Sequence, residues 1–188
     1  MLLKYRQPNR LLGYNYSWNG LYFVTICTKD RVSYFGDIVD FEMRLNENGR
    51  MVEKQWLWLA NQYPYIFLDE FVIMPNHFHG IIEIDETFHG QTNQIGVAVD
   101  TVGTGHDLSL QRTAIPPQKI KSLSEIIGAF KTTSSKLIHQ TDLFDFAWQR
   151  SFHDHIIRDP ESLEKIRLYI KNNPAKWHED RNNPINIK

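Results

Sequence analysis

Two histidines separated by one residue, His77 and His79, carry the strongest chemical signal in this sequence. They lie in an apolar run, with residues 70–75 before them and 81–84 after them. Side chains along a strand alternate between the two faces of a sheet, so both imidazoles point to the same side. Burying two polar rings there without a partner costs free energy. The pattern therefore predicts a shared partner, and a divalent metal ion fits it.

A metal on two histidines needs a third protein ligand, and the last predicted helix offers one. Tyr169 and Asn173 are four residues apart, so they lie one above the other on one helix face. The adjacent apolar stripe of Leu163, Ile166 and Ile170 predicts that Tyr169 lies between core and solvent. If this edge faces the histidine strand, Asn173 reaches the metal and Tyr169 reaches a phosphate held by it.

A tyrosine at such a site could cut and rejoin a phosphodiester strand. Attack by the phenolate forms a phosphotyrosine, which conserves the bond energy and makes rejoining independent of ATP. Because a free phenol has a pKa of about 10, only about one in a thousand is ionised at pH 7. The metal would polarise and orient the phosphate. Lys165 either helps to lower the pKa of the phenol or is a solvated surface lysine.

The composition is that of one globular domain. The 188 residues are 41% hydrophobic and 13% aromatic, which is enough to bury a core. The single cysteine, Cys27, excludes a disulfide framework and is expected to be a buried strand residue. No apolar run approaches the roughly 20 residues of a membrane helix, and the first residues do not resemble a signal peptide. We therefore expect a cytoplasmic protein that does not bind membranes.

The charge is unevenly distributed along the chain. The net charge of −1 does not favour nucleic-acid binding, but residues 1–31 and 108–188 each carry +4, and residues 32–107 carry −9. If the two basic ends meet in space, they form a groove for phosphates. Ordinary solvated charge explains the same distribution.

The hydrophobic patterns predict the order strand, helix, strand, strand, helix, strand, helix. Strands are expected at residues 21–28, 65–74, 78–85 and within 146–157, with a short extra strand at 38–45 and a turn at 46–49. Helices are expected at 50–62, 122–140 and from 159 to about 173. This order predicts an α+β fold: a ferredoxin-like antiparallel sheet (β-α-β-β-α-β) with an added C-terminal helix and the histidine strand at its centre.

Two segments lack such patterns. Residues 1–18 mix basic and aromatic side chains, and we interpret them as an N-terminal DNA-binding arm or as a tail packed on the core. Residues 86–118 have no periodicity, which is typical of a lid, a binding loop or a disordered insertion. We expect a flexible insertion within a single domain that spans residues 1–188.

Four motifs in this order resemble those of the single-tyrosine HUH transposases, and most closely the REP-associated tyrosine transposases. In the metal motif of that family two histidines flank a hydrophobic residue, here Phe78. The four motifs are residues 22–28, 74–82, 148–158 and 169–174. The resemblance extends from about residue 10 to residue 178, except for the insertion.

The resemblance implies an endonuclease and strand transferase that acts on single-stranded DNA, often a hairpin. Tyr169 would be the nucleophile and would leave a 5′-phosphotyrosine and a free 3′-OH. His77 and His79 would hold Mg²⁺ or Mn²⁺, with Asn173 as the third ligand. Asn at this position, which is often Gln in insertion-sequence transposases, fits the domesticated REP-associated branch.

The resemblance also implies contacts to DNA outside the catalytic residues. Four residues of the arm are candidates for reading bases beside the hairpin: Arg6, Arg10, Tyr14 and Tyr16. Lys131 on the predicted helix 122–140 is a candidate phosphate contact. His153 and His155 alternate on the last strand and are interpreted as structural or DNA-facing.

Other interpretations stay open at this point. A cupin-type metal protein would use His77, His79 and Glu83, but its second motif is missing and three helices do not suit a β-barrel. A DNA-binding protein that lost cleavage would bind hairpins on the same fold. A replication initiator or relaxase shares the chemistry but usually has another motif order. The sequence also leaves open whether a homodimer forms and whether one chain completes the site.

Overall fold

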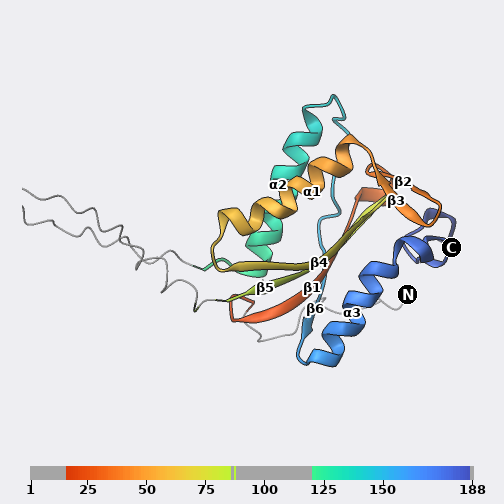
Figure 1. The fold of residues 1–188 in the computed structure, drawn as a ribbon. Helices are drawn as coiled ribbons and strands as arrows, with labels where there is room; N and C mark the ends of the chain where they lie inside the picture. The colour runs from red at the N-terminus through yellow and green to blue at the C-terminus, as the bar shows by residue number, and fades with distance from the viewer. Residues whose placement is uncertain (1–15, 86, 88–119, 187–188) are drawn as a thin grey trace, which may run out of the picture.

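A four-stranded antiparallel sheet is the centre of the computed structural model, which describes residues 16–85, 87 and 120–186 (Figure 1). Its strands, in the spatial order β4-β5-β1-β6, are β4 (Ile66–Met74), β5 (His77–Ile84), β1 (Gly20–Cys27) and β6 (His153–Ile157). Helices α1 (Glu47–Gln62) and α2 (Leu123–His139) cover one face, and α3 (Pro160–Asn172) covers the other. This arrangement confirms the α+β, ferredoxin-like prediction, including α3 as the added helix, and rules out a cupin barrel.

The predicted insertion and most of the predicted arm lie outside the described residues. Within the part of the chain that is described, no helix is both long and apolar enough to cross a membrane.

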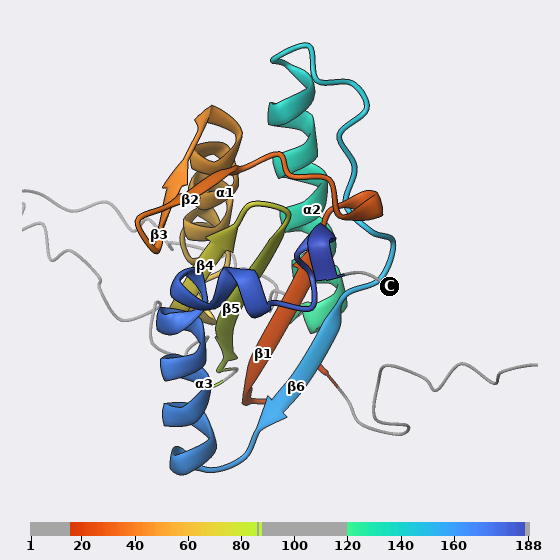
Figure 2. The same ribbon diagram turned by 90° about the vertical axis from the view of Figure 1, so that its right-hand side faces the viewer.

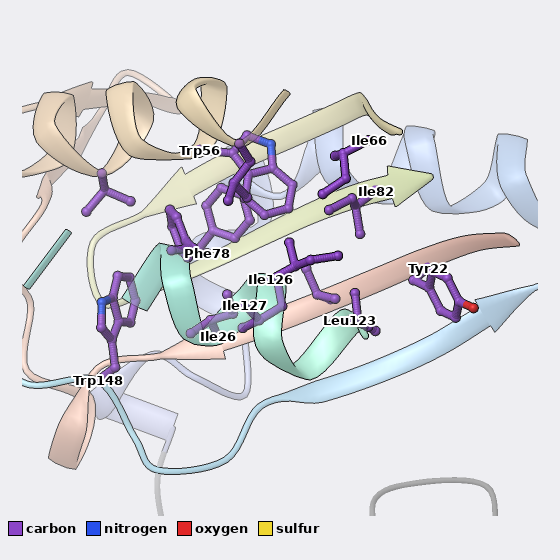
Figure 3. Close-up of a cluster of buried hydrophobic side chains, with 14 of the residues drawn as sticks. Tyr22, Ile26, Trp56, Ile66, Phe78, Ile82, Leu123, Ile126, Ile127 and Trp148 are labelled. Atoms are coloured by element: carbon purple, nitrogen blue, oxygen red, sulfur yellow. The ribbon is translucent and has the colours of Figure 1, made fainter. Parts of the chain in front are cut away.

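Alternation along β5 separates the core from the site. Phe78 and Ile82 point toward α1 and α2 (Figure 3), and both belong with Ile84 to the main hydrophobic core. His77 and His79 occupy the alternate positions, and the next one, Ile81, packs in a smaller apolar cluster with Ile170 of α3. The two imidazoles are therefore buried beneath α3, at 0% and 1% exposure.

Gly80 gives the core aromatic rings room to pack on β5. The ring centroids of Trp56 and Phe78 are 4.5 Å apart. A Cβ added at Gly80 would lie 2.7 Å from atoms of the Phe78 ring and 2.8 Å from Trp56. Neither ring can move freely, because both are fully buried among other aromatic side chains.

We therefore expect Gly80→Ala to lower the free energy of unfolding by about 1–3 kcal/mol, the usual cost of overpacking. Urea denaturation measures it. The matched control is Gly128→Ala, since Gly128 is exposed on α2 and an added Cβ meets nothing within 4 Å. In that control the free energy of unfolding should stay the same or rise by up to about 0.5–1 kcal/mol, because alanine favours a helix more than glycine does. Equal stability of the two variants would contradict the packing argument.

The segment between β1 and α1 differs from the sequence-based prediction. The single extra strand expected at 38–45 is a hairpin of β2 (Gly36–Val39) and β3 (Glu42–Leu45). It reverses at Asp40 and Phe41, whose φ angles are 52° and 65°, and Phe is not a residue that signals such a turn. The turn predicted at 46–49 is instead the cap and first turn of α1, where the Asn46 side chain accepts a hydrogen bond from the Gly49 N–H.

The chain after α3 returns to the sheet instead of leaving it. The short 3₁₀ helix η1 (Lys29–Arg31) follows β1, and the 3₁₀ helices η3 (Pro174–Glu179) and η4 (Pro184–Asn186) follow α3. In Figure 2 this C-terminal segment crosses the sheet at the end where β1 finishes and β5 begins. That end of β5 carries His77, so the return brings new side chains to the histidines.

Candidate active site

Helix α3 is fixed on the sheet by apolar and ionic contacts. Ile170 is 1% exposed and packs in one cluster with Ile81 of β5. Arg167 donates to both carboxylate oxygens of Asp69, at 2.9 and 2.5 Å, where β4 has a bulge between Leu68 and Phe71. These contacts leave Tyr169 at the edge of the helix, 46% exposed, as its sequence position predicts.

Four side chains from distant parts of the chain meet at this edge. The Nε2 atoms of His77 and His79 are 3.0 Å apart. The Tyr169 hydroxyl lies 3.3 Å from Nε2 of His79, and a carboxylate oxygen of Asp180 lies 3.7 Å from Nε2 of His77. The nucleophile candidate and the histidines therefore meet within one chain.

The arrangement fits a divalent cation. Ligand atoms of His77, His79 and Asp180 all lie within 4.8 Å of one another. Adjacent ligands of an octahedral ion at about 2.1 Å are roughly 3 Å apart, close to the separation of the two Nε2 atoms. Asp180 was missed in the sequence because it follows the last predicted helix and belongs to no motif there. Its carboxylate offers a hard oxygen ligand of the kind that suits Mg²⁺ or Mn²⁺.

Asn76 fixes the protonation of His77. The Asn76 Nδ2 group donates to the backbone carbonyls of Arg31 and Asn182, at 2.9 and 2.8 Å. Its Oδ1 atom therefore faces Nδ1 of His77, at 2.8 Å, and can only accept, so Nδ1 carries the proton. The Nε2 atom of His77 is left with a lone pair directed into the site, as a metal ligand requires.

Thr25 holds His79 in the corresponding way. It pairs with His79 across the β1–β5 ladder, and its hydroxyl lies 2.8 Å from Nδ1 of the imidazole. A hydroxyl can donate or accept, so it suits either tautomer of His79.

We expect Thr25→Val to weaken Mn²⁺ binding about 10–100-fold, the usual cost of removing a group that orients a metal-bound histidine. Valine keeps the shape of the buried Thr25 side chain but leaves Nδ1 unpaired. Isothermal titration with Mn²⁺ measures the affinity, and Thr133→Val, which alters a hydroxyl on α2, is the control. Unchanged Mn²⁺ affinity in Thr25→Val would show that this hydroxyl does not orient a ligand.

Burial sets the charge state of the site. It lowers the pKa of His77 well below the usual value, with a further contribution from His79, and lowers the pKa of His79 to about 3. Both imidazoles are therefore neutral at pH 7, the form that binds metals. Burial also raises the pKa of Tyr169, with Asp180 adding to the rise, while Asn173 and Arg181 oppose it. The phenol is protonated at neutral pH.

Lys165 is not among the groups that shift this phenol. It forms an ion pair with Glu161, at 2.6 Å, on the exposed side of α3. Of the two roles considered for Lys165 in the sequence, the surface lysine is the one that this pairing fits.

Asn173 lies beside Tyr169 at the end of α3. Its side chain is hydrogen-bonded to the phenol, which lowers the pKa of Tyr169. The residue is 3% exposed, and its Oδ1 atom has no hydrogen-bond partner among the described residues. A buried oxygen left without a partner is costly, so it suits a ligand role, and Asn173 as a metal ligand stays a prediction.

Two of the residues predicted to contact DNA, Tyr16 and Lys131, are described in the structure, and all of the DNA contacts stay predictions. Arg6, Arg10 and Tyr14 lie outside the described residues. Tyr16 is 9% exposed and belongs to the core cluster, where it packs on Tyr22 with ring centroids 5.9 Å apart, which speaks against stacking on a base. Lys131 donates to the backbone carbonyls of residues 149 and 150, so its ammonium group ties α2 to the segment before β6.

Comparison with known proteins gives a family and a fold. No protein-family model matches the chain. An uncharacterized protein of Haemophilus influenzae is 38% identical over 181 residues, which cover 95% of this chain and 93% of that protein. The chain belongs to the same family. This membership carries no activity with it, because the relative is itself uncharacterized.

The solved structure of a REP-associated tyrosine transposase bound to a REP hairpin is similar over 94% of this chain and 74% of that one. The TM-score is 0.54 and the sequence identity is 18%. At this identity the likeness shows the fold alone, so this chain has a transposase-like fold. A candidate transposase from Deinococcus radiodurans matches over 87% of this chain and 95% of that one, with 14% identity and a TM-score of 0.43, which is too low to support an argument.

Proposed function

We propose that this protein is a metal-dependent, HUH-type single-tyrosine transposase that cuts and rejoins single-stranded DNA at hairpins. The observation that carries the proposal is the position of the Tyr169 hydroxyl, 3.3 Å from one of two neutral imidazoles whose Nε2 atoms converge. The fold shared with a hairpin-bound transposase supports it. Hairpin DNA is proposed as the substrate because that transposase is bound to a REP hairpin.

Different residues of the chain would bind the metal and attack the DNA. His77, His79 and Asp180 would hold Mg²⁺ or Mn²⁺, with Asn173 as a further ligand. A bound divalent ion would polarise the scissile phosphate and stabilise the charge that develops on it. Tyr169 supplies the attacking oxygen and forms a 5′-phosphotyrosine with release of a 3′-OH. The hydroxyl is protonated at neutral pH, so it must lose its proton before or during attack.

The ring of Tyr169 is held for this attack by its neighbours. It packs edge-on against Phe23, with centroids 6.0 Å apart, and lies 5.3 Å from the His79 ring. Phe23 in turn stacks on His79. This packing limits the phenol to a small range of positions before DNA binds, which lowers the entropic cost of reaching the reactive geometry.

The test uses a labelled single-stranded hairpin oligonucleotide with single-stranded flanks, incubated with Mn²⁺ and resolved on a denaturing gel. A band of covalent protein–DNA adduct is expected, and EDTA should remove it. Hairpin binding without any adduct would favour the non-catalytic DNA-binding protein instead. Failure to bind the hairpin at all would overturn the proposal.

A further inference from the structure

A cavity of about 540 Å³ opens beside the nucleophile, between α3 and the C-terminal segment. Its walls carry Tyr169 and Asn173 on one side and Lys176, Asp180 and Arg181 on the other. The cavity is large enough for one nucleotide of a DNA strand. The charges on its walls therefore determine whether the phosphate or the base of a DNA nucleotide lies next to the phenol.

The cations of α3 are neutralised by carboxylates. Arg167 pairs with Asp69, Lys171 with Glu70 at 2.9 Å, and Lys165 with Glu161. Among the residues that the structure describes, no carboxylate forms an ion pair with Lys176 or Arg181. Two carboxylates also line this wall: Glu179, which pairs with His178, and Asp180, which belongs to the candidate metal site. Since neither forms an ion pair with Lys176 or Arg181, both cations stay available to an anion.

Arg181 is fixed at the site by its neighbours on both sides. The Asn182 N–H donates to Asp180 at 2.5 Å, and the Asn182 carbonyl accepts from Asn76, the residue that holds His77. Asn182 is 3% exposed, so this anchor is buried. The backbone of Arg181 is thus fixed relative to the histidines, while its side chain stays exposed at the cavity.

The charge of Arg181 acts on the catalytic groups. It lowers the pKa of Tyr169 and of both histidines. A cation so close to a cation-binding site raises the cost of binding the metal, unless an anion lies between them. A phosphate that contacts both the ion and the guanidinium removes that cost.

We propose that Arg181, assisted by Lys176, binds the scissile phosphodiester beside Tyr169 and is a catalytic residue. The inference deepens the proposed function and rests on it. In the step considered, the Tyr169 oxygen forms a bond to phosphorus and the bond from phosphorus to O3′ breaks. The phenol proton passes to water, and O3′ takes a proton from water. Arg181 stabilises the negative charge that accumulates on the two non-bridging oxygens.

Single-turnover cleavage of the hairpin substrate tests the assignment. Arg181→Gln should slow adduct formation roughly 10²–10³-fold, the range for removing one preorganised transition-state donor. Lys176→Gln should slow it less. Arg181→Lys should cut faster than Arg181→Gln but slower than the wild type, because lysine keeps the positive charge but lacks the paired N–H donors of the guanidinium. The matched control is Lys165→Gln, which alters the opposite wall of the same cavity at a lysine already paired with Glu161, and it should cut at the normal rate.

A substrate with a neutral methylphosphonate at the scissile linkage tests whether Arg181 contacts the scissile phosphate or only supports the fold. If Arg181 neutralises phosphate charge, the penalty of Arg181→Gln should shrink to within about 10-fold on this substrate, because the charge is already gone. The melting temperature of Arg181→Gln without Mn²⁺ should match the wild type, and its rise with Mn²⁺ should be at least as large, because a cation beside the metal site is removed. A normal cleavage rate in Arg181→Gln, an equal penalty on both substrates, or a lost Mn²⁺ response would each overturn the assignment. Absence of an adduct in the wild type would overturn the proposed function itself.

Discussion

The Tyr169→Phe variant is expected to bind hairpin DNA as the wild type does and to form no covalent adduct. Removing the hydroxyl removes the only atom of this side chain that can attack phosphorus, so the rate should fall at least about 10⁴-fold, the order seen when enzymes lose their nucleophile. Phenylalanine keeps the ring that packs on Phe23 and His79, so the fold and the histidines should not change. Denaturing gels measure the adduct and filter binding measures affinity.

The control is Tyr34→Phe. Tyr34 is also partly buried and packs edge-on against Phe146, at 5.2 Å between centroids, but its ring belongs to the main core. It should form the adduct at the wild-type rate. An adduct in Tyr169→Phe would mean that another side chain attacks the DNA, and the proposed role of the α3 edge would then be wrong.

The elements that position the site could be predicted because each carries a strong local signal. His77 and His79 alternate with Phe78 on a strand rich in isoleucine, so their shared face follows from the period of 2. The Asp159 cap fixes where α3 begins, and the apolar stripe through Ile170 fixes which edge holds Tyr169. The strand order does not decide which face of the sheet the added helix α3 covers, so its contact with the histidine face is known only from the structure.

The roles of the groups that surround the histidines could not be predicted, because these roles depend on contacts between segments that are distant in the sequence. Asp180 and Asn182 follow the last predicted helix, where Pro174 was expected to end regular structure and a 3₁₀ helix instead continues the chain. Asn76 lies in the turn before β5, and its role depends on the carbonyl of Asn182, 106 residues later. Thr25 could have been found only from the register of β1 against β5.

The His77→Ala variant should lose the thermal stabilisation that Mn²⁺ gives to the wild type. A ligand that binds only the folded state at 100 times its Kd stabilises it by about 2.7 kcal/mol. For a chain of this size, that corresponds to a rise in Tm of roughly 5–10 °C. His77→Ala removes one imidazole ligand and leaves His79 without its neighbour at 3.0 Å, so no rise is expected. His77→Ala should also form no covalent adduct with DNA. Melting curves with and without Mn²⁺, followed by circular dichroism, measure the shift.

The comparison that isolates the metal effect is His153→Ala, because His153 is an exposed histidine on β6. Mn²⁺ also binds surface imidazoles weakly, and such binding would raise the Tm of both variants alike. Only a site built from the two buried imidazoles predicts that His153→Ala keeps the full rise while His77→Ala loses it. His77→Ala also removes the hydrogen bond to Asn76 and leaves a cavity, so its Tm without Mn²⁺ should lie below that of the wild type. The rise in Tm caused by Mn²⁺ is therefore compared within each protein, and an undiminished rise in His77→Ala would exclude the two histidines as the metal site.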